Sequence, residues 1–463
     1  MKKFDLIVIG SGSGLEVSSE AADRGLSVAV VEHGPFGGTC LNRGCIPSKM
    51  LIHSADVMET IQRAELFGIK AQVSAVDWDF IIKRASDTVD GDAQTVEEGN
   101  RQHPKISVFK DTARFVGEKV LEVGGERITG EMIVIAAGTR PYVPEIEGIR
   151  DVPFITSDEA LRLPKQPRRL TILGGGYIAA EMAHFFGAMG TEVTIVHRGP
   201  RLLRQEDDDV AARFTEVYQR RFTMLLTTVI KRAARDGDEI ALEVASDGGT
   251  RTVKADVLLL AVGRVSNTDV LDVAKTGVAV DERGFINTDE FLETNVPGIW
   301  ALGDIVGRYL LKHSANLEAA YVANNIFNPD NKVAVDYHAM PRAIFASPQV
   351  ASVGLTERAA RENGVPYVAG SYRYYDTAYG ASIEDKDGFV KALADRESGD
   401  ILGCHIIGSE ASMLIQEVVN AMRMRLTTDA ITQSIYVHPA LPEVVQRAFG
   451  SLRAWAEPAE KRL

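Results

Sequence analysis

The composition of this chain is that of an ordinary globular protein and excludes several classes. It has 463 residues, of which 45% are hydrophobic and 25% charged, and its formal net charge is −13. A chain of this length suggests about three domains at roughly 150 residues each. The acidic balance argues against a nucleic-acid partner, and no apolar run approaches the roughly 20 residues that a membrane helix needs. Three cysteines are too few for a secreted disulfide scaffold, so we expect a reducing, cytoplasmic location.

Residues 4–32 have the pattern of a dinucleotide-binding fold. An apolar strand is followed by the glycine turn GSGSG at residues 10–14, a helical stretch and a second strand that ends in Glu32. Glycines in such a turn let the backbone approach a pyrophosphate at a helix N-terminus. An acid about 20 residues further on is placed to accept hydrogen bonds from ribose hydroxyls. A glycine turn in another kind of α/β protein is the alternative. The predicted contacts are Gly10, Gly12, Gly14 and Glu32.

The same pattern recurs in residues 168–198, with its glycine turn at Gly174 and Gly176. His197 stands where the first copy has its acid, and three arginines follow at positions 198, 201 and 204. Loss of the acid removes repulsion against a 2′-phosphate, which arginine binds through paired hydrogen bonds. We therefore predict NADPH contacts at Arg198 and Arg204, with NADH as the alternative coenzyme. A solvated basic loop is the competing interpretation.

Three further strands end in glycine turns. Residues 294–304 end in Gly303-Asp304, which suits binding of the ribityl chain of FAD, so we expect FAD in the first nucleotide fold. The apolar stretches 132–141 and 256–264 are expected to mark the crossings between two nucleotide domains. The candidate cofactor contacts in these segments and near the first turn are Thr39, Gly138, Gly263 and Asp304.

Two of the three cysteines, Cys40 and Cys45, stand five residues apart in the stretch GGTCLNRGCIPSK. In a regular helix such residues lie roughly 8–9 Å apart, whereas a disulfide needs Cα atoms at about 4.4–6.8 Å. The pair can therefore bond only if the helix is distorted, which Gly44 would permit. A disulfide that closes so small a loop stabilises the fold little, so redox chemistry is favoured over a structural bridge. A zinc site is disfavoured because the residues between the two cysteines offer no ligand for zinc. Arg43, between the cysteines, is expected to favour thiolates.

Near the C-terminus, His438 precedes Glu443 in the stretch YVHPALPEVVQRAF. Pro442 fits the first turn of a helix, which places Glu443 at the helix start, where it can orient the imidazole. Such a pair can act as a general acid and base. The spacing alone is weak evidence for this role.

Taken in order along nearly the whole chain, these motifs resemble those of the FAD-dependent pyridine nucleotide–disulfide oxidoreductases. The most specific are GGTCLNRGCIPSK and HPALPE. The resemblance implies that electrons pass from NADPH through FAD to Cys45, that Cys40 exchanges with the substrate sulfur, and that His438 with Glu443 moves the proton. It also implies an ion pair of Lys49 with Glu181 near the flavin. Tyr177 would cover the nicotinamide pocket.

The expected fold is α/β, with two Rossmann-like domains for FAD and NAD(P)H and a C-terminal α+β dimerisation domain. The expected boundaries are 1–150 for the FAD domain, 151–268 for the NAD(P)H domain, 269–338 for the continuation of the FAD domain, and 339–463 for the dimerisation domain. In this family the His–Glu pair comes from the partner subunit, so the resemblance implies a homodimer with shared active sites.

Two branches of the family are close candidates for the substrate, and we expect a low-molecular-weight disulfide, as in the first of them, with the second as the alternative. Segments such as HRGPRLLR, YGASIED and YVHPALPEVV look like mycothione reductases, which reduce a small disulfide. Dihydrolipoamide dehydrogenases, which oxidise dihydrolipoyl groups with NAD, share CLNRGCIPSK but usually have an acid where His197 stands. A flavin-dependent NAD(P)H oxidase is a remoter alternative.

Overall fold

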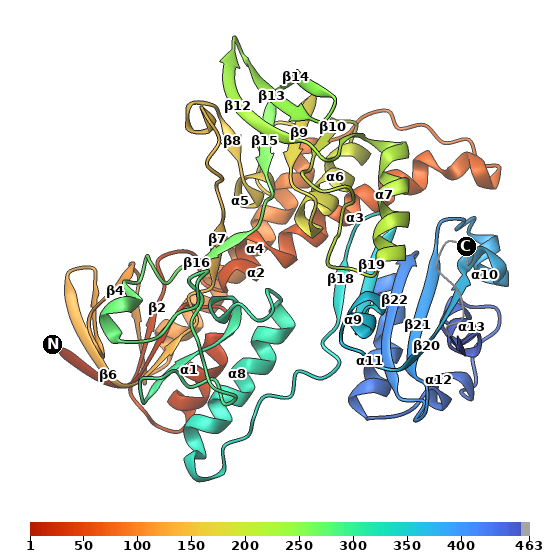
Figure 1. The fold of residues 1–463 in the computed structure, drawn as a ribbon. Helices are drawn as coiled ribbons and strands as arrows, with labels where there is room; N and C mark the ends of the chain where they lie inside the picture. Colours follow the sequence, from red (N-terminus) through yellow and green to blue (C-terminus); the bar gives the residue numbers. More distant parts are fainter. Residues whose placement is uncertain (455–463) are drawn as a thin grey trace.

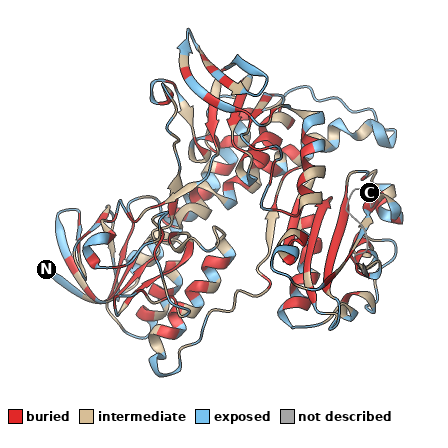
Figure 2. Ribbon diagram, viewed as in Figure 1, coloured by how far each residue is buried: buried red, intermediate tan, exposed pale blue. Residues whose placement is uncertain are grey.

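The computed structural model describes residues 1–454. Its seven-, five- and six-stranded sheets lie in three separate lobes (Figure 1). Figure 2 shows that buried residues are concentrated in these sheets and in the helices packed on them. No helix among these residues is both long and apolar enough to cross a membrane.

The first lobe is built around β1, which pairs in parallel with β2 and β6. β17 also pairs in parallel with β6, so the chain returns to this sheet more than 100 residues later. Residues 6–9 of β1 are buried on both faces, as parallel strands usually are. The strands are β1 (Lys2–Ile9), β2 (Val28–Val31), β3 (Ile106–Phe109), β4 (Ala113–Gly117), β5 (Val120–Val123), β6 (Glu126–Ile135) and β17 (Ile299–Ala301). The helices are α1 (Gly14–Asp23), α2 (Gly38–Arg43), α3 (Cys45–Gln62), α4 (Trp78–Gln102) and α8 (Lys312–Phe327).

The second lobe repeats this plan with an all-parallel five-stranded sheet. Its helix α6 is apolar on nearly every side because it lies between this sheet and α3. The strands are β8 (Phe154–Ile155), β9 (Arg169–Leu173), β10 (Glu192–Val196), β11 (Thr223–Leu225) and β15 (Val257–Leu260), with an antiparallel sheet of β12 (Val229–Asp236), β13 (Glu239–Ser246) and β14 (Gly249–Ala255). The helices are α5 (Ser157–Ala160), α6 (Tyr177–Ala188) and α7 (Asp208–Arg221).

The chain crosses between these two lobes in two strands that pair with each other. β7 (Thr139–Pro141) and β16 (Arg264–Ser266) form a two-stranded antiparallel sheet. They directly follow the glycine turns at Gly138 and Gly263, both of which have positive φ, at 62° and 117°. The crossings therefore lie where the apolar stretches 132–141 and 256–264 predict them.

The third lobe is an antiparallel sheet covered by helices α11 and α13. Pro442 occupies the first turn of α13, as the sequence predicts, and the buried face of this helix is formed by Val444, Val445, Ala448 and Phe449. The strands are β18 (Arg342–Ile344), β19 (Gln349–Gly354), β20 (Tyr367–Arg373), β21 (Phe389–Asp395), β22 (Ile401–Gly408) and β23 (Arg453–Ala454). The helices are α9 (Glu357–Glu362), α10 (Ala378–Ser382), α11 (Ala411–Arg423), α12 (Asp429–Thr432) and α13 (Pro442–Gly450).

Short 3₁₀ turns complete the described chain. They are η1 (Ala64–Phe67), η2 (Ile149–Asp151), η3 (Val273–Thr276), η4 (Gly303–Val306), η5 (Pro329–Asn331) and η6 (Tyr374–Asp376). The first-lobe sheet is mixed, since β5 pairs antiparallel with both β4 and β6, whereas the second-lobe sheet is all parallel. These two Rossmann-like sheets and a C-terminal α+β lobe form the α/β architecture expected from the sequence.

Candidate active site

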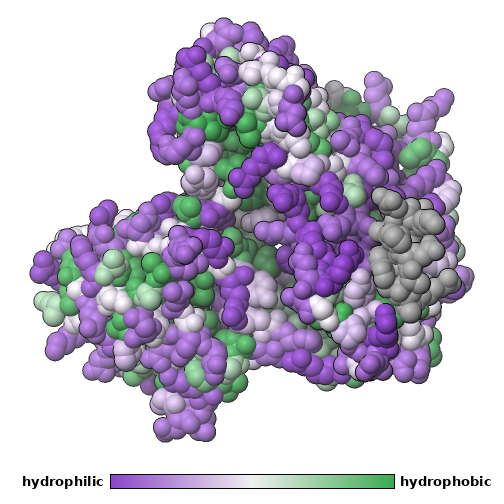
Figure 3. Space-filling view, in the orientation of Figure 1, coloured by the Kyte–Doolittle hydropathy of each residue, from purple (hydrophilic) through white to green (hydrophobic). Residues whose placement is uncertain are grey.

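A cavity of about 2110 Å³ runs between the first and second lobes, where Figure 3 shows the surface hollowed. It exceeds the roughly 300–1,000 Å³ of a pocket for one drug-sized ligand, so it has room for more than one large ligand. Most sequence-predicted site residues line it: Gly10, Gly12, Glu32, Thr39, Cys40, Cys45, Lys49, Gly138, Gly174, Gly176, Tyr177, Glu181, Arg198, Arg204, Gly263 and Asp304.

The two glycine turns bring backbone to the cavity wall at corresponding places. Gly10 has φ 102°, and a Cβ there would lie 2.3 Å from the carbonyl oxygen of Ala136. Gly174 has φ 147°, and a Cβ would lie 2.2 Å from the carbonyl oxygen of Ala261. Gly176 faces open space, which leaves room for a phosphate at the start of α6.

Gly14, by contrast, lies outside the cavity. A Cβ there would lie 2.8 Å from the side chain of Ala136 and 2.9 Å from that of Val8. Its position thus allows α1 to pack closely on the sheet, as the third glycine of such a turn does. In a G-x-G-x-x-G pattern that begins at Gly10 the last position is Leu15, and Gly14 supplies the close packing one residue earlier.

Glu32, which directly follows β2, is fixed as a carboxylate in the first nucleotide fold. Its Oε2 accepts hydrogen bonds from the N–H and hydroxyl of Ser11, at 3.0 and 2.8 Å, and its Oε1 accepts one from Gly34 N at 2.8 Å. Burial opposes the charge, but these bonds and one from His33 lower the pKa of Glu32 to about 2. Sequence reasoning missed Ser11, which lies within the predicted turn.

The two cysteines lie at a break between two helices. α2 ends at Arg43 and α3 begins at Cys45, with Gly44 between them at φ −145° and ψ −117°. A Cβ on Gly44 would lie 2.8 Å from the carbonyl oxygen of Thr39, so only glycine allows this close approach. The helix distortion that the five-residue spacing requires is therefore present, although both thiols are free here.

The environment makes the two sulfurs chemically unequal. A hydrogen bond from Cys40 is the largest effect on Cys45; together with the positive charge of Lys49 it outweighs burial and lowers the pKa of Cys45 to about 7. The same hydrogen bond, with burial, raises the pKa of Cys40. Above about pH 7 the reduced pair therefore favours a Cys45 thiolate that accepts a hydrogen bond from the Cys40 thiol.

Lys49 reaches across from α3 to Glu181 on α6. Its Nζ lies 2.8 Å from both carboxylate oxygens and 4.5 Å from the centre of the Phe345 ring. Glu181 is buried and also accepts a hydrogen bond from Phe345 N at 3.0 Å. The pair that the resemblance implies is therefore formed between two lobes, beside Cys45.

Contrary to expectation, Arg43 pairs with an acid and is not the main cation that favours the thiolate. Its guanidinium lies 3.6 Å from Asp158, which partly neutralises it. The cation that favours ionisation of Cys45 is Lys49. The difference arises because Arg43 lies on the last turn of α2, while Lys49 lies one turn after Cys45 on α3.

The pKa of Cys45 leads to a prediction for the reduced protein. Because the thiolate is the nucleophile, alkylation of Cys45 by iodoacetamide should rise with pH around a midpoint of about 7. Lys49→Met removes a stabilising cation, so the midpoint should move up toward the ordinary cysteine pKa of about 8.5. Mass spectrometry of alkylated peptides across pH measures both midpoints. An unchanged midpoint in Lys49→Met would contradict the assignment, and Lys83→Met, an exposed lysine on α4, is the matched control.

In the loop after β10, the three arginines that follow His197 have different surroundings. The guanidinium of Arg201 lies 3.8 Å from the Asp208 carboxylate. Arg198 and Arg204 line the cavity and form no ion pair within the described part of the chain. His197 packs against Gly175, and its Nε2 is buried without a hydrogen-bond partner among residues 1–454. Burial and the two nearby arginines lower the pKa of His197, so the positive charge that faces the cavity at this point comes from the arginines.

Asp304 also lines the cavity, in a group of residues of which sequence reasoning found only a part. Its carboxylate accepts a hydrogen bond from the Thr139 hydroxyl at 3.1 Å. Arg264, which we did not predict, donates to the hydroxyl and carbonyl of Thr139 at 2.8 and 2.7 Å. β7 and β16 bring these residues together. Asp304 is therefore oriented from the crossing strands.

His438 and Glu443 lie together but away from this cavity. His438 Nδ1 is 2.9 Å from Glu443 Oε1, and Glu443 Oε2 accepts a hydrogen bond from Ala440 N at 3.0 Å. The hydrogen bond with His438 lowers the pKa of Glu443. His438 is 72% exposed, and neither residue lines the cavity. Two neighbouring apolar side chains, Ile435 and Val437, are also exposed, at 101% and 77%. In a single chain, His438 therefore lies at the surface next to exposed apolar side chains.

Comparison with known proteins identifies the family. Residues 4–325 match the family "Pyridine nucleotide-disulphide oxidoreductase" and residues 340–449 match its dimerisation domain. The chain is 40% identical to mycothione reductase of Mycobacterium tuberculosis, over 98% of this chain and 100% of that protein. It is 33% identical to dihydrolipoyl dehydrogenase of Chlamydia muridarum, over 98% of this chain and 96% of that one.

Solved structures agree with this result. The HOCl-induced flavoprotein disulfide reductase RclA from Escherichia coli matches with a TM-score of 0.86 and 28% identity, over 96% of this chain and 99% of that chain. The chain therefore belongs to the pyridine nucleotide–disulfide oxidoreductases, flavoenzymes that use FAD and a pyridine nucleotide, and it carries their C-terminal dimerisation domain.

Proposed function

We propose that this enzyme uses NADPH to reduce a low-molecular-weight disulfide through the Cys40–Cys45 pair, with mycothione as the first candidate substrate. The net reaction consumes NADPH and a proton and turns one disulfide into two thiols. The observation that carries the proposal is the placement of Cys40 and Cys45 on either side of the Gly44 break, with the Lys49–Glu181 ion pair beside them. The 40% identity to a mycothione reductase supports the choice of substrate.

The cavity fits FAD at its first-lobe end. The backbone of Gly10 and Gly12 would hold the pyrophosphate, Glu32 the ribose, and Asp304 the ribityl chain. When bound, FAD supplies the two-electron relay between a nicotinamide and a disulfide. Lys49, held by Glu181, would lie beside Cys45, and Tyr177, which lines the cavity, would cover the nicotinamide pocket. Thr39, Gly138 and Gly263 complete the proposed contacts.

Arg198 and Arg204 support NADPH as the coenzyme because they face the cavity without acidic partners in residues 1–454, while His197 replaces the acid that would repel a 2′-phosphate. Arg198→Ala and Arg204→Ala should each lower kcat/KM for NADPH by about 10- to 100-fold, the usual range for one charge-assisted hydrogen bond. The value for NADH should stay within about twofold, because NADH lacks this phosphate.

Steady-state rates with both coenzymes measure this preference. Arg201→Ala is the matched control, since Arg201 is already engaged by Asp208. Equal losses for NADPH and NADH in Arg204→Ala would mean that the arginine is a surface feature. A wild-type enzyme that prefers NADH would make dihydrolipoamide the leading substrate.

We further propose a homodimer in which each active site takes Cys40 and Cys45 from one subunit and His438 and Glu443 from the other. The dimerisation domain supports the dimer. The exposed apolar residues around His438, and the absence of His438 from the cavity within residues 1–454, support the sharing. His438 would move the proton to and from the Cys40 sulfur.

For domain boundaries we propose 1–150 and 269–338 for FAD, 151–268 for NADPH and 339–463 for dimerisation. The pairing of β17 with β6 supports the assignment of 269–338 to the first lobe. The scarcity of cysteine supports a cytoplasmic enzyme.

The substrate is tested by comparing NADPH oxidation with mycothione, glutathione disulfide and lipoamide, and NAD reduction with dihydrolipoamide. Mycothione reduction with the highest kcat/KM is the expected result. Faster NAD-linked oxidation of dihydrolipoamide would favour the dehydrogenase, which the 33% identity to dihydrolipoyl dehydrogenases keeps as the alternative. Oxygen consumption that survives loss of the cysteines, without any disulfide turnover in the wild type, would indicate an oxidase.

A further inference from the structure

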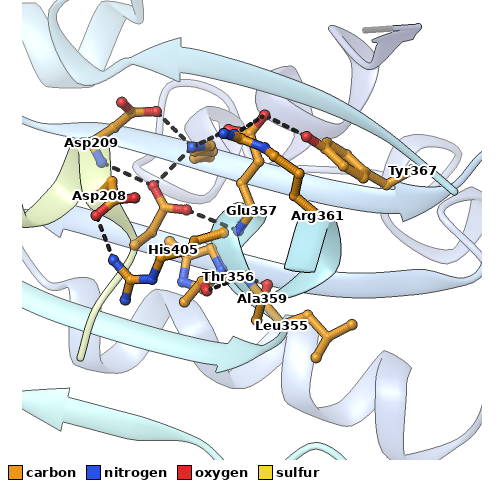
Figure 4. A network of polar contacts seen from close by, with 12 residues as sticks. Asp208, Asp209, Leu355, Thr356, Glu357, Ala359, Arg361, Tyr367 and His405 are labelled. Atoms are coloured by element: carbon orange, nitrogen blue, oxygen red, sulfur yellow. Dashed lines mark hydrogen bonds and ion pairs between the residues drawn. The ribbon is translucent and has the colours of Figure 1, made fainter. Parts of the chain in front are cut away.

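A buried lysine outside the cavity joins the second and third lobes. Figure 4 shows the polar network of this region, in which Asp208 and Asp209 lie close to Glu357 and Tyr367. Lys391, on β21, places its Nζ 2.8 Å from Asp207 Oδ1, 2.6 Å from Asp209 Oδ2 and 2.6 Å from Glu357 Oε2. The side chain of Asp207 caps α7 in the second lobe, and Glu357 begins α9 in the third. Lys391, Asp207 and Glu357 are all at least nine-tenths buried.

Each of these buried charged groups has ion-pair or hydrogen-bond partners. Burial opposes ionisation of Asp207, but His405 and Lys391 outweigh it and lower its pKa. Asp207 also accepts a hydrogen bond from Glu357 N at 3.1 Å, and Glu357 accepts one from the Tyr367 hydroxyl at 2.9 Å. Buried ion networks add little net stability against apolar packing but fix one geometry, because each broken contact leaves a buried charge.

This network fixes the end of the loop formed by residues 198–207. The loop carries the two arginines that face the cavity, Arg198 and Arg204. Besides Asp207, the third lobe holds it at two further points. The Ser352 hydroxyl donates to Glu206 Oε2 at 2.7 Å. Arg358 Nη2 donates to the backbone carbonyl oxygen of Arg204 at 3.1 Å, while its Nη1 bonds Asp208 Oδ1 at 2.6 Å.

The contact of Arg358 with Arg204 links the network to the cavity. The backbone of Arg204 is held by α9, while its side chain has no acid partner in residues 1–454 and lines the cavity. A guanidinium binds a phosphate through paired, directional hydrogen bonds, and such a site must be held within about 0.5 Å of the productive geometry. Holding the Arg204 backbone therefore bears directly on phosphate binding.

We infer that Arg358 is a positioning residue for the 2′-phosphate of NADPH, acting through Arg204, and that the third lobe thereby helps to set coenzyme preference. This inference rests on the proposed NADPH site. A merely structural contact between lobes would instead lower stability, or the rate with both coenzymes, without favouring one of them.

The test uses the FAD-loaded dimer and the variant Arg358→Met, which keeps most of the aliphatic stem. KM for NADPH should rise about tenfold, the effect of losing one charged hydrogen bond, with kcat unchanged and NADH kinetics within about twofold. Calorimetric titration with 2′,5′-ADP should show a similar loss of affinity, while 5′-AMP should bind as before. Ser352→Ala should move the same quantities in the same direction, by a smaller factor. Arg373→Met, an exposed arginine on β20 of the same lobe, is the control.

A double-mutant cycle separates this inference from the proposal on which it rests. In an Arg204→Met background, Arg358→Met should change 2′,5′-ADP affinity no further. If Arg204→Met weakens 2′,5′-ADP binding but Arg358→Met does not, the positioning role is overturned and the NADPH site stands. If Arg204→Met itself has no effect on 2′,5′-ADP, the NADPH site fails and the inference falls with it. Equal losses for NADPH and NADH in Arg358→Met would also overturn the inference.

Discussion

Replacement of either Cys40 or Cys45 by serine is expected to lower NADPH-dependent disulfide reduction by at least about 10³-fold, as when a covalent nucleophile is removed. In the proposed mechanism the two sulfurs have separate roles, because Cys40 would exchange with the substrate while Lys49 favours the thiolate of Cys45. FAD content and reduction of the flavin by NADPH should be retained, because neither cysteine is needed for nucleotide binding. Steady-state turnover and anaerobic flavin reduction measure the two quantities on the same preparation.

Cys404→Ser is the matched control for this experiment, since Cys404 is buried in β22 with no contact to the cavity. It should keep disulfide turnover. Retention of turnover in Cys40→Ser would contradict the assigned chemistry. Loss of FAD from that variant would instead show that its folding is impaired, and Cys45→Ser would then serve as the test.

Mixed dimers should recover activity from two inactive chains. Alone, Cys45→Ser should be inactive, and His438→Ala should lose about 10²- to 10⁴-fold, the usual contribution of a general acid or base. In a dimer of one chain of each kind, one site takes an intact cysteine pair from the His438→Ala subunit and an intact His438 from the Cys45→Ser subunit. The other site lacks both. About half of the wild-type turnover per dimer is therefore expected.

The measurement is turnover after co-expression and tandem purification with two different tags, which isolates the mixed dimer. A mixture of Cys45→Ser with Cys40→Ser serves as the control, because each site then has a damaged cysteine pair and no site is complete. Turnover no higher than in this control would mean that His438 acts within its own chain or not at all.

Much of the site was predictable because it is encoded locally. The glycine turns at Gly10 and Gly174 require positive φ and close backbone approach, and both requirements leave a mark in the sequence. The break at Gly44 follows from helix geometry and the reach of a disulfide. The buried face of α13 follows from the spacing of its apolar residues.

The parts that could not be predicted from local pattern are side-chain pairs made by tertiary packing. Lys49 and Glu181 are 132 residues apart, and only the family resemblance indicated their contact. Arg43 was expected to act on the cysteines because it lies between them, but Asp158 of another element binds it. The contacts of Arg264 with Thr139, and of Arg358 with Arg204, leave no local pattern, because each depends on how two lobes meet.

The most direct test of the central claim is the number of electrons that the oxidised enzyme accepts in an anaerobic titration with dithionite, followed through the flavin absorbance. A redox-active Cys40–Cys45 disulfide and a flavin each take two electrons. We therefore predict uptake of about four electrons per chain in the wild type and about two in Cys40→Ser. Uptake of about two electrons by the wild type, unchanged in Cys40→Ser, would contradict a redox-active cysteine pair.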